Sequence, residues 1–182
     1  EKAAGPEMAA SPSMAAVGYY PFLTDIAGPE HLAAMRLYLF SPRHFGTPWP
    51  VPSQSLDDPL SDPEGRWKGK RTRCPWNGRA WLMTTSHVAD ALGNAALTLD
   101  RDLRPQAADF LHRYIRMLFI DRDPQRPTSY EYYNPLTAQP PYFRGTEDYK
   151  HPWIVDLIVR YVAGVQPQDG PSVVVEPLPM GL

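Results

Sequence analysis

Two stretches of sequence decide the fold: RAWLMTTSHVADALGNAAL, from Arg79 to Leu97, and LRPQAADFLHRYIRMLF, from Leu103 to Phe119. Both repeat apolar residues at helical spacing: Trp81, Val88, Leu92 and Ala95 in the first stretch, and Ala107, Leu111, Tyr114 and Leu118 in the second. About five residues join the two stretches, which is typical of helices that lie antiparallel in a hairpin. We therefore expect two amphipathic helices whose facing stripes bury Leu92 and Leu111.

A third helix is predicted from Leu32, Met35 and Leu39, which also recur at helical spacing. Pro29 suits its first turn, because proline has the backbone φ of a helix and no N–H to leave unpaired. The helix should end before Pro42.

Residues from Trp153 to Val165 are apolar nearly all round, which predicts a helix buried on most of its faces. Asp156 and Arg160 lie four residues apart and are expected to pair on its one exposed strip. Three consecutive valines between Ser172 and Glu176 indicate a short strand or an extended tail. Residues 166–182 are accordingly predicted to form an extended C-terminal tail.

Proline is the compositional outlier, at 22 of 182 residues, or about 12% where roughly 5% is usual. Because proline locks φ, it favours ordered loops between short elements over long helices and strands. Such loops run from Pro42 to Asn77 and from Pro124 to Lys150. The length suits one domain or part of one, and residues 1–18 are predicted to be the end of an upstream element or a linker.

Charge and hydropathy exclude several classes of partner. Eighteen basic and 20 acidic residues give a net charge of -2, so neither nucleic acid nor an anionic membrane surface is an expected partner. No apolar run approaches the roughly eighteen residues of a membrane span, which predicts a soluble protein. The single Cys74 can form no internal disulfide and is expected to be a buried, inert thiol, which slightly favours the cytoplasm.

Several common kinds of site lack their residues. The sequence has no Gly-rich phosphate loop, no paired Cys motif, no His-Glu-x-x-His and no Gly-x-Ser-x-Gly, so we predict no cofactor and no metal site. His31 and His112 fall within helical patterns and are expected to be ordinary surface or core residues. Cys74 and His87 lack a third group that would orient a nucleophile and its base.

Acidic, amide and aromatic side chains coincide in two loops. One cluster is Trp76-Asn77-Gly78-Arg79-Ala80-Trp81; the other is Tyr130-Glu131-Tyr132-Tyr133-Asn134-Pro135-Leu136-Thr137, followed by Asp148-Tyr149-Lys150-His151. Sugars present apolar C–H faces and polar edges, so this combination fits a saccharide site. Aromatic rings that only pack the loops onto the helices would give the same pattern.

These clusters resemble the C-terminal motifs of the six-hairpin glycosidases. The matching runs, in chain order, are Trp76 to Trp81, Glu131 to Thr137 and Asp148 to Leu157. More narrowly, they resemble the mannosylglycerate hydrolase-like and processing α-glucosidase-like group, and Phe45 to Asp58 resembles the loop that precedes them. The resemblance extends from about Tyr19 to Val165.

The resemblance implies an all-α fold, a partial (α/α)6 toroid of helical hairpins with long Pro-rich and aromatic loops that build the site at one end. It also implies an inverting glycosidase, acting on an α-linked glucoside or mannoside, whose general base falls on Glu131. The residues expected to bind substrate are Trp76, Asn77, Arg79, Trp81, Tyr132 and Tyr133. Arg79 stands where the family has proline and would place a cation near the site, and Ala138 stands where it has glycine. Either change is expected to alter the shape of its loop.

A complete toroid needs more chain than this. Twelve helices of about 11 residues with connections of about five already require roughly 190 residues. We therefore expect residues 19–165 to be the C-terminal part of the catalytic domain, with the acid and the remaining hairpins in upstream polypeptide. Asp57 and Asp58 could serve as a second carboxylate, but Asp-Asp-Pro in a loop is more typical of a turn. The alternative function is a non-catalytic carbohydrate-binding or scaffold protein derived from the same fold.

Overall fold

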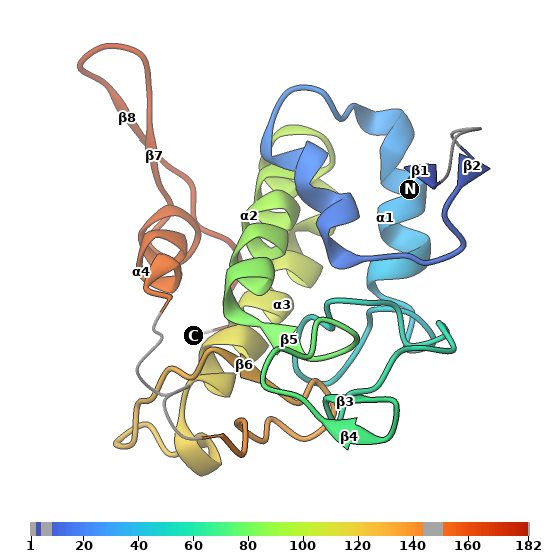
Figure 1. The fold of residues 1–182 in the computed structure, drawn as a ribbon. Coiled ribbons are helices and arrows are strands. Elements are labelled where there is room, and N and C mark those ends of the chain that lie inside the picture. The colour runs from blue at the N-terminus through green and yellow to red at the C-terminus, as the bar shows by residue number, and fades with distance from the viewer. Residues whose placement is uncertain (1–2, 5–8, 144–150, 182) are drawn as a thin grey trace.

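The chain is rich in helices, as predicted (Figure 1). The computed structural model describes residues 3–4, 9–143 and 151–181. Its α-helices are α1 (Leu32–Leu39), α2 (Leu82–Thr98), α3 (Arg104–Met117) and α4 (Trp153–Leu157). Short 3-10 helices are η1 (Ala16–Leu23), η2 (Pro29–His31), η3 (Arg101–Leu103) and η4 (Ile120–Arg122), and η5 (Ile158–Val162) is a π-helix that continues α4.

Within the described residues, four antiparallel strand pairs accompany the helices, and of these strands the sequence indicated only the one at the three valines after Ser172. They are β1 (Ala3–Ala4) with β2 (Ala9–Ala10), β3 (Arg66–Trp67) with β4 (Lys70–Arg71), β5 (Ala80–Trp81) with β6 (Tyr132–Tyr133), and β7 (Val165–Pro167) with β8 (Val173–Val175). Each strand has only two or three residues, so the pairs act as clasps between loops. Part of the predicted upstream segment 1–18 lies outside the described residues, as do Asp148, Tyr149 and Lys150 of the third motif.

Helix α2 is the central element, and η1, α3 and α4 all pack against it (Figure 1). Eleven of its 17 residues are buried, more than a single apolar stripe would give. Alanine, glycine, serine and threonine occupy most of the additional buried positions. These small side chains let neighbouring elements approach α2 from several sides, so it is a core helix and not a surface one.

The predicted hairpin of α2 and α3 is confirmed. The chain reverses through η3, where the Asp100 carboxylate accepts a hydrogen bond from the backbone N–H of Asp102. Leu92 and Leu111 are buried, at 0% and 2% exposure. The hydroxyl oxygens of Ser86 and Tyr114 lie 2.8 Å apart within the core and tie the two helices together.

The start of α2 differs from the prediction, which placed Arg79 to Trp81 in the helix. Ala80 and Trp81 are extended and form β5, with Trp81 opposite Tyr132 in β6. A strand partner from a distant part of the chain therefore overrides the helical spacing at Trp81. Helix α1 agrees with its prediction, since η2 begins at Pro29 and the predicted apolar residues of α1 are buried.

The predicted burial of the helix after Trp153 is wrong. Of α4 and η5, only Leu157 and Tyr161 are buried, whereas Val155 is 58% exposed. The helix contacts α2 with one face, and no described residue covers the opposite face. Arg160 is also not paired with Asp156: its guanidinium donates to the Asp90 carboxylate of α2 at 2.8 Å.

Tyr161 fixes the position of this C-terminal helix. Its hydroxyl donates to the backbone carbonyl of Asp90 at 3.0 Å, and its ring packs over Gly93, where a Cβ atom would lie 2.5 Å from a ring carbon. After the helix, β7 and β8 form a hairpin arm with exposed valines. The chain then returns to the core, where Leu178 is buried and its N–H donates to the carbonyl of Tyr161.

Candidate functional site

The β5–β6 pair brings together the two motifs that the sequence marked as a saccharide site. Trp81 lies opposite Tyr132, and the N–H of Leu82, at the start of α2, donates to the carbonyl of Glu131 at 3.3 Å. The backbone of Glu131 is therefore anchored to the first residue of the central helix. Loops that are far apart in the sequence meet here because the two short strands complete each other's hydrogen bonds.

Three aromatic rings form a stack beside this clasp. The Trp76 and Trp81 rings are parallel, with centroids 3.9 Å apart, and the Tyr132 ring lies 4.7 Å from Trp81 at a tilt of 41°. Trp81 donates from Nε1 to the carbonyl of Pro75, and the Tyr132 hydroxyl donates to the carbonyl of Arg73. Trp81 and Tyr132 are buried, while Trp76 is 42% exposed. The stack thus presents one indole face to solvent on a rigid base.

Asn77 and Arg79 are buried beneath the stack, where they hold loop backbone in place. The Asn77 amide donates to the carbonyls of Leu60 and Arg66 at 3.0 and 2.9 Å. The Arg79 guanidinium donates to the carbonyls of Glu64 and Gln139. Burial lowers the pKa of Arg79, and its Nε has no partner among the described residues.

Tyr133 is likewise buried and occupied by its own loop. Its hydroxyl accepts a hydrogen bond from the Tyr130 N–H at 2.9 Å, and burial raises its pKa to about 12. Of the six predicted substrate-binding residues, Trp76 has a large exposed surface, and the other five are buried.

Glu131 is half-buried and directly precedes Tyr132 of the aromatic stack. Removal of the carboxylate from water raises the pKa of Glu131, because burial disfavours the charged form. Among the described residues, no ion pair or hydrogen bond engages its carboxylate. The carboxylate is therefore accessible to a water or a ligand.

Ala138, which stands where the family pattern has glycine, lies in the loop after Glu131. Its φ is +60°, in the left-handed region that favours glycine. Its N–H donates to the carbonyl of Asn134 at 2.9 Å, and the Asn134 amide in turn donates to the Glu64 carboxylate. The loop therefore has a left-handed turn at this position with alanine in place of glycine.

Asp57 and Asp58, the two candidates for a second carboxylate, form local contacts. Asp58 accepts a hydrogen bond from the backbone N–H of Leu60 at 2.8 Å, the turn predicted for Asp-Asp-Pro. Asp57 accepts from the Ser55 hydroxyl and faces His44, and the Ser55 hydrogen bond is the main reason that the pKa of Asp57 is lowered.

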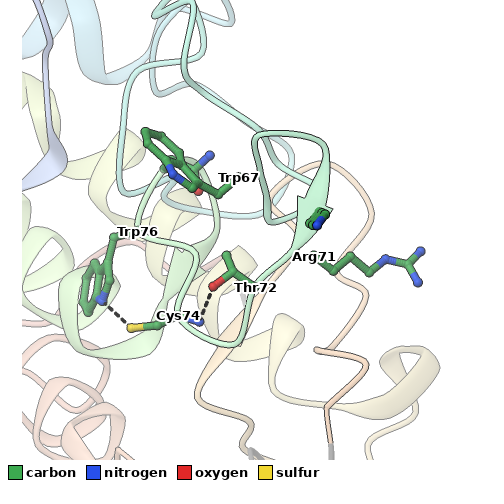
Figure 2. Close-up of a pocket in the computed structure, with 7 residues that line it drawn as sticks. Trp67, Arg71, Thr72, Cys74 and Trp76 are labelled. Carbon is green, nitrogen blue, oxygen red and sulfur yellow. Dashed lines mark hydrogen bonds between the residues drawn. The ribbon is translucent and has the colours of Figure 1, made fainter.

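An open pocket of about 490 Å³ lies beside Trp76, between the stack and the β3–β4 hairpin (Figure 2). Its lining residues are Trp67, Lys70, Arg71, Thr72, Cys74, Trp76 and Asn77. Cys74 is exposed and not buried as predicted, because its loop runs along the surface; its Sγ accepts a hydrogen bond from Trp76 Nε1 at 3.1 Å. Trp67 was not among the predicted site residues, because its only signal in the sequence is its place in a run of cations.

Two classes of feature are absent from the described part of the chain. Within residues 3–4, 9–143 and 151–181, no three His, Cys, Asp or Glu side chains come together as metal ligands. No helix in the same residues is both long enough and apolar enough to span a membrane.

Comparisons with known proteins agree with the geometry. Residues 6–152 match the model of the mannosylglycerate hydrolase MGH1-like glycoside hydrolase domain. An uncharacterized protein of Borreliella burgdorferi is 39% identical over 49 residues, which span 27% of this chain and 10% of that protein.

Solved structures share the fold at low sequence identity. A structure described as a sialidase is 17% identical, with a TM-score of 0.74 over 92% of this chain and 15% of its own. A GH63 mannosylglycerate hydrolase from Thermus thermophilus, solved in complex with glucose, is 18% identical, with a TM-score of 0.55 over 81% of this chain and 30% of its own. The chain therefore spans less than a third of the length of these relatives.

Proposed function

This chain belongs to the mannosylglycerate hydrolase MGH1-like glycoside hydrolase family, and we propose that it contributes the general base, Glu131, to an inverting glycosidase. The observation that carries the proposal is the environment of the Glu131 carboxylate. Its carboxylate is half-buried, its pKa is raised by burial, and no described residue neutralises it. A carboxylate held only for stability would be expected to have an ion-pair or hydrogen-bond partner.

In the proposed mechanism, Glu131 takes a proton from a water that attacks the anomeric carbon on the face opposite the leaving group. A second carboxylic acid protonates the glycosidic oxygen. The two groups of an inverting pair stand roughly 6.5 to 9.5 Å apart, which leaves room for the water. The raised pKa of Glu131 makes it a stronger base once ionised.

We assign the sugar-facing surface to Trp76, whose exposed indole suits the apolar C–H face of a pyranose ring. Trp81 and Tyr132 hold that indole from behind, while Asn77, Arg79 and Tyr133 fix the loops around it. The substrate we propose is an α-linked glucoside or mannoside. The Thermus thermophilus relative, a mannosylglycerate hydrolase solved with glucose, supports this choice.

The acid and the rest of the fold are proposed to lie outside these 182 residues. We infer that residues 19–165 form the C-terminal part of an (α/α)6 toroid, and that the general acid comes from another part of the toroid. The exposed apolar face of α4 and η5, with Val155 and Val159 at 58% and 48% exposure, supports this placement, because toroid helices pack on both sides. The short span of this chain on its relatives supports it as well.

The test is hydrolysis by the complete protein of a panel of α-glucosides and α-mannosides, with the product anomer followed by proton NMR. The proposal predicts that the first product formed from an α-glycoside is the β-anomer. A first product of α configuration would contradict the inverting assignment. Saccharide binding without hydrolysis of any glycoside would favour the alternative, a carbohydrate-binding or scaffold protein in which the buried polar residues only shape the surface around Trp76.

A further inference from the structure

The near-neutral net charge conceals a local excess of positive charge. Five of the eight residues from Arg66 to Arg73 are Lys or Arg, and none of the eight is acidic. All five cations are exposed. They lie on and directly after the β3–β4 hairpin, and two of them, Lys70 and Arg71, line the pocket beside Trp76 (Figure 2).

The hairpin holds these charges in a fixed arrangement. Its two turn residues, Lys68 and Gly69, both have positive φ, as in a tight two-residue hairpin turn. Arg66 is directly opposite Arg71, and like charges at opposed strand positions destabilise a hairpin. Bound anions would relieve this repulsion.

The hairpin cations have no acidic partner, unlike many arginines elsewhere. Seven arginines outside the hairpin pair with carboxylates: Arg36, Arg43, Arg101, Arg104, Arg113, Arg126 and Arg160. Among the described residues, no Asp or Glu forms an ion pair with any of the five hairpin cations. Arg71 stacks 4.0 Å over the Tyr142 ring, a contact that orients the guanidinium and leaves its charge uncompensated.

Two exposed indoles border the same pocket. Trp67 is 47% exposed and Trp76 is 42% exposed. Trp67 and Lys70 are cross-strand partners and therefore share one face of the hairpin, on the side of the pocket. Trp76 belongs both to this pocket and to the stack beside Glu131, so a ligand in the pocket would continue into the proposed sugar site.

We propose that the β3–β4 hairpin binds an oligosaccharide that carries several anionic groups, in continuation of the sugar site at Trp76. The inference rests on the proposed function and adds a substrate class to it. Several cations spaced along a rigid hairpin match a ligand with an anion on successive sugar units, and the indoles match the apolar faces of its rings. Carboxylates and sulfates share this chemistry.

The experiment measures binding by the complete protein to hexasaccharides of galacturonic acid, to sulfated heparin-derived hexasaccharides and to neutral maltohexaose. Arg66, Lys68 and Lys70 are replaced together by Gln. The matched control replaces Arg43, Arg101 and Arg126 by Gln. It removes the same number of positive charges, but from other exposed positions. Circular dichroism and thermal unfolding verify that both triple variants fold.

The hairpin variant should lose about tenfold in affinity for the acidic hexasaccharides, since three exposed charge contacts are removed. The control variant should retain its affinity, and a rise in salt should weaken binding by the parent protein more than by the hairpin variant. The affinities for the galacturonic acid and the sulfated hexasaccharides then show which anion is preferred.

Single-stranded DNA is included as a fourth ligand. Three results would overturn the inference: equal affinity of both variants for the acidic hexasaccharides, no preference for acidic over neutral hexasaccharides, or equally tight binding of the DNA. Hydrolysis of a neutral glycoside without binding of acidic ones would reject the hairpin site and leave the proposed function intact. Binding of acidic ligands through the hairpin without hydrolysis of any glycoside would support the site and reject the catalytic role of Glu131.

Discussion

At the scale of single residues, the site depends on groups held in conformations or environments that they do not prefer. The Glu131 carboxylate is partly buried, and the backbone of Ala138 is in the left-handed region. The two residues flank β6: Glu131 directly precedes this strand, and Ala138 lies in the loop that follows it. Such local costs persist only where the surrounding contacts fix the chain, as the hydrogen bonds of Asn134 do here.

Ala138→Gly tests the strain at the left-handed position. Glycine adopts positive φ without the Cβ clash of alanine, so the change should leave stability unchanged or raise it by up to about 1 kcal/mol. The control is Ala163→Gly, at a residue with φ of -75°, which should destabilise the protein by about 0.5 to 1 kcal/mol. Chemical denaturation measures both. A clear loss of stability in Ala138→Gly would contradict the strain argument.

The raised pKa of Glu131 predicts the acid limb of the activity profile. A general base works when ionised, so activity falls as the pH drops through its pKa. Because burial raises that pKa, the limb in kcat/KM should lie above the ordinary range of a glutamic acid. The exposed Glu30 offers a control, since Glu30→Gln should leave the limb in place. A limb at the ordinary glutamate pKa would mean that Glu131 is solvated in the working enzyme.

At the scale of elements, the sequence predicts helices well where their apolar residues recur over several turns. The stripes of α1, α2 and α3 are long enough to show their period, and all three helices are present. The strands of the clasps have two or three residues, too few to show a period, so the sequence pattern places β5 within α2 and does not reveal the β3–β4 hairpin. The pairing partners lie in other loops, and a single sequence does not identify them.

The prediction for the last helix failed for a different reason. An apolar sequence predicts that a surface is to be covered, but it does not identify which part of the protein covers it. Within the described residues, α2 covers one face of α4 and η5, through Leu157 and Tyr161. Among the predicted site residues, burial likewise depended on tertiary contacts. The sequence marked Arg79 and Tyr132 as substrate-binding residues but did not reveal that both side chains are buried.

Gly93→Ala tests the packing between α2 and the C-terminal helix. Alanine has the higher helix propensity, by about 1 kcal/mol, so an exposed position would gain stability. At Gly93 the new Cβ would lie 2.5 Å from a carbon of the Tyr161 ring, and the helix must shift. The variant should therefore lower the melting temperature and weaken the Tyr161 contact with Asp90. Gly18→Ala, where no heavy atom lies within 4 Å, is the control; an equal or higher melting temperature for Gly93→Ala would contradict the packing.

At the scale of the whole molecule, two apolar surfaces lie on the same C-terminal region. They are the outer face of α4 and η5, and the β7–β8 arm with Val173 and Val175 at 60% and 68% exposure (Figure 1). Contiguous apolar surface of this kind is typical of an interface. In the proposed toroid, helical hairpins from the remainder of the domain cover this apolar surface.

The 182-residue chain produced by itself should therefore associate. We expect oligomers or aggregates in sedimentation velocity, and a return toward a single species when Val155 and Val159 are both replaced by Lys. Replacement of the exposed Leu37 and Leu60, at 62% and 57% exposure on other surfaces, should not have this effect. A monomer with cooperative thermal unfolding would indicate that these residues form a closed fold, and the toroid proposal would then fail.

The most direct test of the account is turnover by Glu131→Gln in the complete protein, measured together with sugar binding. The amide has nearly the shape of the carboxylate but cannot accept the proton of the attacking water, so kcat should fall by about 100-fold or more. Binding of the sugar, which depends on Trp76, should be unchanged, and the melting temperature at neutral pH should be equal or higher because an ionised group that resists burial has been removed. Unchanged turnover, or a parallel loss of folding and sugar binding, would contradict the assignment of Glu131 as the base.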